Sequence, residues 1–159
     1  MVKLLNVITD YFSKEVSGDK EFFGSLPPKR SLQVLLGSKS DIERAKEVFE
    51  FFEKRKIPYD QYFISCHRNP FKLLYYACVL PKKARVLMVG GLAYAAPGVL
   101  RGWLNYFGKL NPIFVLPVGD DRKLTKVAYE SSKFLPPGIE VNLKELDESL
   151  EDFLKEVIL

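Results

Sequence analysis

The chain has 159 residues, of which 47% are hydrophobic and 13% aromatic, enough for one domain with a sizeable core. Its 24 basic and 20 acidic residues give a net charge of +4 spread along the sequence, and so mild an excess does not indicate nucleic-acid binding. The two cysteines, Cys66 and Cys78, form neither a metal-ligand pattern nor a disulfide framework, and no apolar run approaches the length of a membrane span. We therefore expect a cytoplasmic protein with no nucleic-acid or membrane partner.

The first 30 residues differ from the rest of the chain. Residues 2–16 repeat apolar side chains at helical spacing, and residues 17–30 form a connector that contains glycine, serine and proline. We expect residues 1–30 to be a helical extension with its connector and residues 31–159 to be the main domain. The sequence leaves open whether the extension packs on the domain, covers its site or contacts another subunit.

Strands and helices alternate from residue 32 onward. The apolar run at residues 32–36 predicts a strand, and residues 40–56 predict a helix with a capping-box pattern at Ser40 and Glu43 and with Ile42 on its buried face. A second strand is expected over residues 59–65. The next helix begins at Pro70 and has its apolar positions at Phe71, Leu74, Tyr75, Cys78 and Val79.

The second half of the chain continues this alternation. Strands are predicted over residues 85–90, 112–116 and 139–141, and helices over residues 99–107 and 122–133. Apolar residues from Leu143 to Val157 predict a final helix that packs on the core or forms an oligomer contact. The alternation indicates a parallel sheet, whose post-strand loops lie along one edge, where open α/β folds bind their ligands.

The loop at residues 37–41 reads Gly-Ser-Lys-Ser-Asp and opens a helix. Unpaired N–H groups at a helix start favour an anion such as phosphate, and Ser38 and Ser40 add hydroxyl donors. The loop matches neither the Walker pattern nor the dinucleotide-binding glycine pattern. A simple capped turn, with Asp41 as a first-turn carboxylate, explains the same residues.

The loop after the second strand contains the only histidine of the chain, His67, followed by Arg68. Histidine is the side chain that changes charge near neutral pH, and arginine is a fixed cation. A lone histidine is often structural, but the position of His67 beside other loops of one sheet edge favours catalysis. We interpret Cys66 as a small buried residue rather than a nucleophile, because neighbouring side chains of an extended chain point apart.

The loop at residues 91–98 follows the third strand and is small, apolar and uncharged. Such a loop lets the backbone approach a flat ligand and excludes water from it. A close-packed turn between strand and helix explains the same composition.

Taken in order, these three loops resemble the motifs of the PurE family, the catalytic subunit of phosphoribosylaminoimidazole carboxylase in purine biosynthesis. That family carries Gly-Ser-x-Ser-Asp, Ser-Ala-His-Arg-x-Pro and Gly-Gly-Ala-Ala-His-Leu-Pro-Gly, each after a parallel strand. The chain matches the first motif completely and the second except for Cys66, and the resemblance spans residues 31–141. The third loop departs, with Leu92 for glycine, Tyr94 for alanine and Ala95 at the position of a second histidine. The charged run at residues 119–123 also replaces a serine- and glycine-rich segment.

The resemblance implies a three-layer flavodoxin-like domain that assembles as a homo-octamer and binds a phosphoribosyl substrate with no metal or organic cofactor. It implies that His67 is the general acid and base. Arg68 would pair with the phosphate, and Ser38 and Asp41 would contact the phosphate and ribose. The other substrate-binding positions carried over from the motifs are Gly37, Ser40, Ser65, Gly91, Ala93, Ala95 and Pro97, the last three in the loop that would wall in carbon dioxide.

The activity implied by the resemblance is that of a 5-(carboxyamino)imidazole ribonucleotide mutase, an isomerase that moves a carboxylate from the exocyclic nitrogen to a ring carbon. The His-Arg pair is more similar to the mutase class than to the direct carboxylase class, where lysine tends to follow the histidine. A direct aminoimidazole ribonucleotide carboxylase, a lyase, is one alternative. An inactive relative that binds a nucleotide or a protein is another, which Tyr94 and Ala95 favour. An unrelated flavodoxin-like module would require both motif matches to be coincidence.

Overall fold

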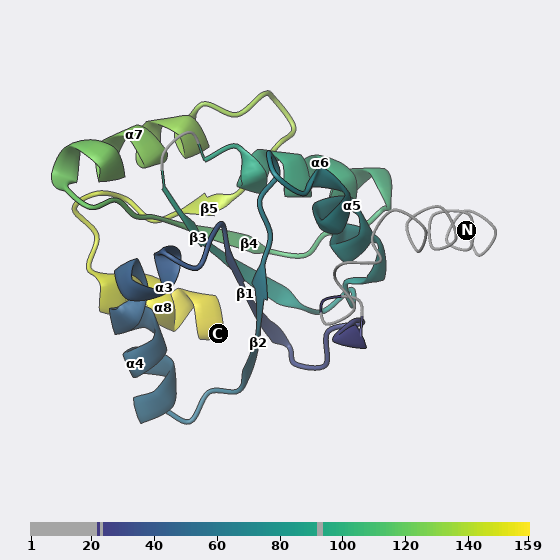
Figure 1. Cartoon of the computed structure of the whole chain (residues 1–159), viewed down its shortest axis with the longest axis horizontal. Coiled ribbons are helices and arrows are strands. Elements are labelled where there is room, and N and C mark those ends of the chain that lie inside the picture. Colours follow the sequence, from purple (N-terminus) through teal and green to yellow (C-terminus); the bar gives the residue numbers. More distant parts are fainter. Residues whose placement is uncertain (1–21, 23, 92–93) are drawn as a thin grey trace.

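Five parallel strands form the sheet at the centre of the protein, in the order β2-β1-β3-β4-β5. The computed structural model describes residues 22, 24–91 and 94–159, so the helix expected over residues 2–16 lies outside the described residues. Helices cover both faces of the sheet (Figure 1), which confirms the three-layer flavodoxin-like arrangement. No helix in the described ranges has the length and apolar character needed to cross a membrane. The strands are β1 (Leu32–Leu36), β2 (Tyr59–Phe63), β3 (Arg85–Gly90), β4 (Ile113–Pro117) and β5 (Asn142–Leu143), and the helices are α3 (Asp41–Arg44), α4 (Lys46–Lys54), α5 (Pro70–Val79), α6 (Ala96–Tyr106), α7 (Arg122–Lys133) and α8 (Leu150–Ile158).

The register of β1 brings neighbouring strand ends to one edge of the sheet. Leu36, the last residue of β1, lies opposite Phe63 of β2 on one side and Val89 of β3 on the other. Val89 in turn lies opposite Leu116 of β4. The chain runs from β1 to β2 on one side and then places β3 on the other side. The loops after these three strands therefore meet at the topological switch point of the sheet.

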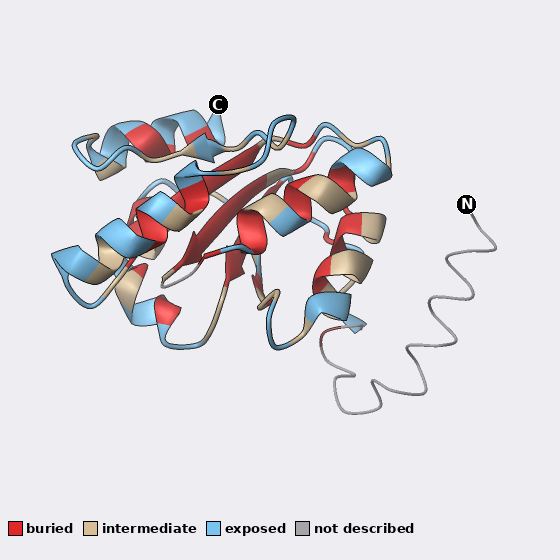
Figure 2. Ribbon diagram, turned by 90° about the horizontal axis from the view of Figure 1, so that it is seen from above, coloured by how far each residue is buried: buried red, intermediate tan, exposed pale blue. Residues whose placement is uncertain are grey.

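Alternate side chains of the strands pack into two hydrophobic cores, one on each face of the sheet. The core shared with α5 and α6 contains the strand residues Leu35, Val86, Met88, Ile113 and Val115. The core shared with α4 and α8 contains their neighbours along the chain, Val34, Leu36, Leu87, Val89, Phe114 and Leu116. Because both faces of these strands are covered (Figure 2), β1, β3 and β4 are continuous apolar runs in the sequence.

The described part of the connector is anchored on β2. The backbone N–H groups of Lys29 and Arg30 each donate a hydrogen bond of 2.7 Å to Oδ2 of Asp60. Phe22 is buried in the core beneath α5 and packs edge-on against Tyr62, with ring centroids 6.0 Å apart. This part of the connector therefore packs on the α/β domain.

The segment after β1 differs from its prediction. The sequence predicts one helix over residues 40–56, whereas the structure has two, α3 and α4, which are separated at Ala45. Ser40 makes no side-chain cap, and Ile42, predicted on the buried face, is 41% exposed. The carboxylate of Asp41 accepts the loop N–H bond instead, which turns Asp41 inward and Ile42 outward. The capping-box prediction is therefore wrong.

The buried face of α5 also differs from its prediction. Its buried residues are Leu73, Tyr76 and Ala77, whereas Phe71, the first residue of the predicted set, is 52% exposed. Because α5 has apolar residues on most of its sides, the sequence pattern does not select the face that meets the core.

The C-terminal elements begin later than predicted. Strand β5 consists of Asn142 and Leu143 rather than residues 139–141, and it pairs with β4. The side-chain amide of Asn142 donates a hydrogen bond of 3.2 Å to the carbonyl of Ile113, which fixes this register. Helix α8 begins at Leu150, after Ser149 has capped it by accepting a hydrogen bond of 3.0 Å from the N–H of Asp152.

A substitution of Gly119, in the loop between β4 and α7, tests how closely this loop packs on the start of α7. A Cβ atom there would lie 2.5 Å from the backbone nitrogen of Thr125, in the first turn of α7. We expect Gly119→Ala to lower the free energy of unfolding by about 1–3 kcal/mol, because backbone atoms cannot move aside cheaply. Gly102→Ala is the control, since a Cβ in this part of α6 meets nothing within 4 Å; it should stabilise the protein by about 0.5–1 kcal/mol. Equal urea midpoints for the two variants would contradict the packing argument.

Candidate active site

A pocket of about 500 Å³ opens where the loops after β1, β2 and β3 meet. The predicted site residues that line it are Gly37, Ser38, Ser40, Asp41, Ser65, His67, Arg68, Gly91 and Ala95. Pro97 is buried in the first turn of α6 and does not line the pocket. Ala93 lies outside the described residues. Further lining residues that the sequence did not single out for the site are Arg44, Ile64, Cys66, Gly90, Tyr94 and Ala96.

Asp41 organises the loop after β1. Its Oδ2 accepts hydrogen bonds from the N–H of Ser38 at 2.8 Å and from the Ser38 hydroxyl at 3.0 Å. The Ser38 hydroxyl also lies 2.6 Å from Oγ of Ser40. One backbone donor on which the predicted anion site depends is thus already used, and α3 has only 4 residues with which to form a dipole.

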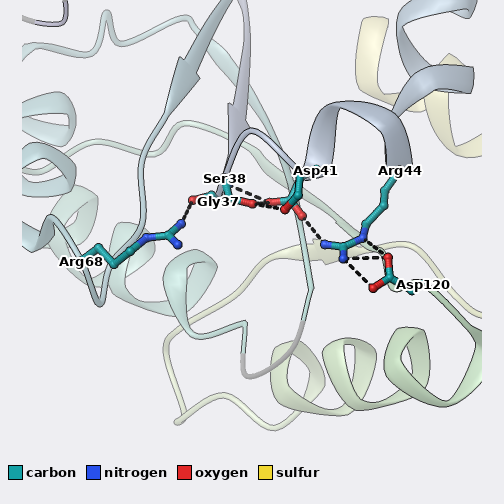
Figure 3. Close-up of polar contacts among 7 residues, drawn as sticks. Gly37, Ser38, Asp41, Arg44, Arg68 and Asp120 are labelled. Atoms are coloured by element: carbon teal, nitrogen blue, oxygen red, sulfur yellow. Dashed lines mark hydrogen bonds and ion pairs between the residues drawn. The ribbon is translucent and has the colours of Figure 1, made fainter.

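Arg44 closes this side of the pocket by pairing with two carboxylates (Figure 3). One guanidinium nitrogen lies 2.9 Å from Oδ1 of Asp41, while Nε and Nη2 each donate a hydrogen bond of 2.8 Å to Asp120. The hydrogen bond with Asp120 is the largest cause that raises the pKa of Arg44. Asp120 belongs to the charged run at residues 119–123. Through its ion pair with Arg44, this run connects the loop after β4 to the segment after β1. The sequence signal that could have indicated the pair of Asp41 and Arg44 is the spacing of an acid and a base three residues apart on a helix.

The loop after β2 holds His67 and Arg68 at the mouth of the pocket. The side chain of Asn69 accepts a hydrogen bond of 2.6 Å from the N–H of Ser65, which closes the turn. Nη2 of Arg68 reaches across to the carbonyl of Gly37 at 2.6 Å (Figure 3). Among the described residues no carboxylate pairs with Arg68, whereas Arg44 has two. Arg68 is therefore the pocket cation whose charge is available to an anionic ligand.

His67 and Cys66 have different surroundings although they are adjacent. His67 is exposed and lines the pocket. Cys66 is half-buried, and burial raises the pKa of its thiol. A thiol that stays protonated is a poor nucleophile. Cys66 was predicted to be buried, but it is half-buried, packs against the core beside α5 and also lines the pocket. No cluster of potential metal ligands is present in the part of the chain that the structure describes.

Tyr94 forms part of the pocket wall after β3. Its side chain is only 6% exposed, and a Cβ atom on Gly90 would lie 2.3 Å from the ring. The ring therefore packs directly on the backbone at the end of β3, and only glycine leaves room for it. Ala95, one of the residues predicted for this loop, is exposed and lines the pocket.

Asp41 is buried and Asp120 is 66% exposed in its side chain, so the two partners of Arg44 should contribute differently to stability. We expect Asp41→Asn to lower the free energy of unfolding by about 1–3 kcal/mol, because it removes a buried acceptor of charged and neutral hydrogen bonds. Asp120→Asn, the matched control, should cost less than about 1 kcal/mol, as exposed ion pairs do. Urea unfolding measures both variants, and a larger loss for Asp120→Asn would refute the assignment of Asp41 as the organising residue.

Comparison with protein families matches residues 31–150 to AIR carboxylase. The match extends from the residue before β1 to the first residue of α8, so it includes every strand and every loop of the pocket. Comparison with individually curated proteins finds no match. Because the family match covers most of the chain and coincides with the pocket, the chain belongs to the AIR carboxylase family, the PurE family of purine-biosynthesis enzymes.

Proposed function

We propose that the protein is a 5-(carboxyamino)imidazole ribonucleotide mutase. The bond between the exocyclic nitrogen and the carboxyl carbon breaks and releases carbon dioxide, and His67 gives a proton to the nitrogen. The neighbouring ring carbon then attacks the carbon dioxide, and His67 takes the proton that this carbon loses. The sum is an isomerisation in which one proton and one carboxylate exchange places, with no external reagent.

The observation that carries this proposal is the position of His67 and Arg68 side by side at a pocket where three post-strand loops meet. A reaction that first gives and then takes a proton needs one group that does both near neutral pH, and His67 is the only histidine of the chain. Arg68 has no carboxylate partner among the described residues, which suits it to the substrate phosphate. Among the described residues, Oδ1 of Asp41 accepts a hydrogen bond only from Arg44, so it retains a lone pair for a ribose hydroxyl.

The pocket wall also suits the proposed intermediate. Ile64, the ring of Tyr94 and Ala96 contribute apolar surface to the pocket lining. A carboxylate that leaves water for an apolar pocket loses carbon dioxide more readily, and the same wall holds carbon dioxide near the ring carbon.

A spectroscopic assay with the carboxyamino nucleotide and its carboxylated isomer, run in both directions, tests the proposal. Interconversion without added carbon dioxide is the expected result. Turnover of aminoimidazole ribonucleotide with carbon dioxide, and none of the carboxyamino form, would contradict the mutase and support a direct carboxylase. Binding without any turnover would contradict both and support an inactive relative.

His67→Asn should abolish turnover and leave nucleotide affinity within about tenfold, because proton transfer and phosphate binding depend on different groups. Lys39→Asn is the control, because Lys39 is exposed and does not line the pocket although its neighbours in the loop after β1 do; it should leave turnover unchanged. Kinetics and calorimetric titration give the two quantities. Equal losses of turnover and affinity in His67→Asn would refute this division of roles.

Arg68→Ala should weaken nucleotide binding by about 1.5–3 kcal/mol, the range for a lost charge-assisted hydrogen bond. Arg55→Ala removes the same charge from the surface of the chain after α4, where Arg55 pairs with Glu151, and should leave the affinity unchanged. If both variants bind equally well, the phosphate lies elsewhere.

We also propose the homo-octamer that the family resemblance implies. Light scattering of the purified protein should give about eight times the mass of one chain, 18.2 kDa. A monomer or dimer mass would contradict it.

A further inference from the structure

The hydroxyl group of Tyr94 is a polar group in the pocket that the protein leaves without a partner. No hydrogen bond joins it to any residue in the described ranges, and Tyr94 is buried. The same is true of Tyr76, whose hydroxyl is completely enclosed in the core between β2 and α5. Tyr94 differs because it lines the pocket and its hydroxyl is not among the enclosed polar atoms, so the hydroxyl is open to a ligand.

The Tyr94 side chain is held against the end of β3. Its ring lies against Gly90 at the end of β3, where any larger residue would displace it. Asp41 is close enough to influence its ionisation, but the Asp41 oxygens already accept from Ser38 and Arg44. The Tyr94 hydroxyl donates no hydrogen bond to Asp41 or to any other described residue, so a ligand that enters the pocket can supply its acceptor.

The charge state of Tyr94 makes it a donor. Burial is the main cause that raises the pKa of its hydroxyl well above the ordinary value, and the nearby Asp41 and Cys66 raise it further. The phenol therefore keeps its proton at neutral pH. A neutral donor in a pocket of low polarity binds anionic oxygen without adding a second full positive charge to that of Arg68.

We propose that the Tyr94 hydroxyl donates a hydrogen bond to the carboxylate group that the enzyme transfers. This inference rests on the proposed function and adds to it a residue that selects for the carboxylated nucleotide. It assigns the phosphate to Arg68 and the carboxylate to Tyr94, two groups that come from different loops of the pocket.

The test compares two nucleotides that differ only in the carboxylate, namely the carboxylated isomer and aminoimidazole ribonucleotide. Tyr94→Phe keeps the ring and removes the hydroxyl. We expect it to weaken binding of the carboxylated nucleotide about tenfold to hundredfold, the range for a hydrogen bond to a charged group, and to leave aminoimidazole ribonucleotide unaffected. Tyr76→Phe, the matched control, removes a buried and unpartnered hydroxyl away from the pocket and should change neither affinity.

Gly90→Ala provides a second, independent variant. The added Cβ would displace the Tyr94 ring, so this variant should also lose affinity for the carboxylated nucleotide. A thermal unfolding curve for each variant checks that a loss of affinity does not come from unfolding.

Two results would overturn the inference. If the wild-type protein binds both nucleotides and Tyr94→Phe weakens both equally or neither, the hydroxyl does not contact the carboxylate, and the proposed function stands without it. If the wild-type protein binds neither nucleotide, the proposed function fails, and the inference fails with it.

Discussion

The site depends on the parallel register of β1. Because Leu36 lies opposite both Phe63 and Val89, the carboxyl ends of β1, β2 and β3 are aligned at one edge of the sheet. This alignment brings side chains from loops some 25 residues apart in sequence to a single pocket. A slip of β1 by one residue would turn its core side chains to the opposite face and separate the loops. The two hydrophobic cores that bury alternate strand residues therefore also hold the pocket together.

The two arginines at the pocket differ in whether a carboxylate neutralises them. On the side of the β1 loop, Asp41, Arg44 and Asp120 satisfy one another and give a rigid wall. On the side of the β2 loop, the only partner of the Arg68 side chain among the described residues is a backbone carbonyl, and His67 is exposed. Tyr94, from the loop after β3, adds a neutral hydroxyl to the pocket lining. Two departures of this chain from the motifs of its family therefore lie at the same pocket. Asp120 pairs with Arg44, and Tyr94 brings a hydroxyl group to the loop after β3.

Much of the fold could be predicted because buried parallel strands are continuous apolar runs, as at Val86 and its neighbours in β3. The buried face of α5 could not be predicted, because this helix has apolar residues on most of its sides. Its packing in the folded protein buries Tyr76 and leaves Phe71 exposed. The loop positions of His67, Arg68 and Ser38 followed from motif and strand order. Arg44 was missed because its role depends on Asp120, 76 residues later in the chain. The place of the Tyr94 ring in the pocket wall could not be predicted either, because it depends on the close approach of the ring to Gly90.

The most direct test of the account follows the transferred carbon itself. The carboxyamino nucleotide, labelled with ¹³C in its carboxylate, is mixed with the protein and an excess of unlabelled bicarbonate, and the product is analysed by ¹³C NMR. Because the mutase holds the released carbon dioxide in the pocket, the account predicts that the label appears on the ring carbon undiluted. A product that carries unlabelled carbon from the solution, or no product at all while the nucleotide binds, would contradict it.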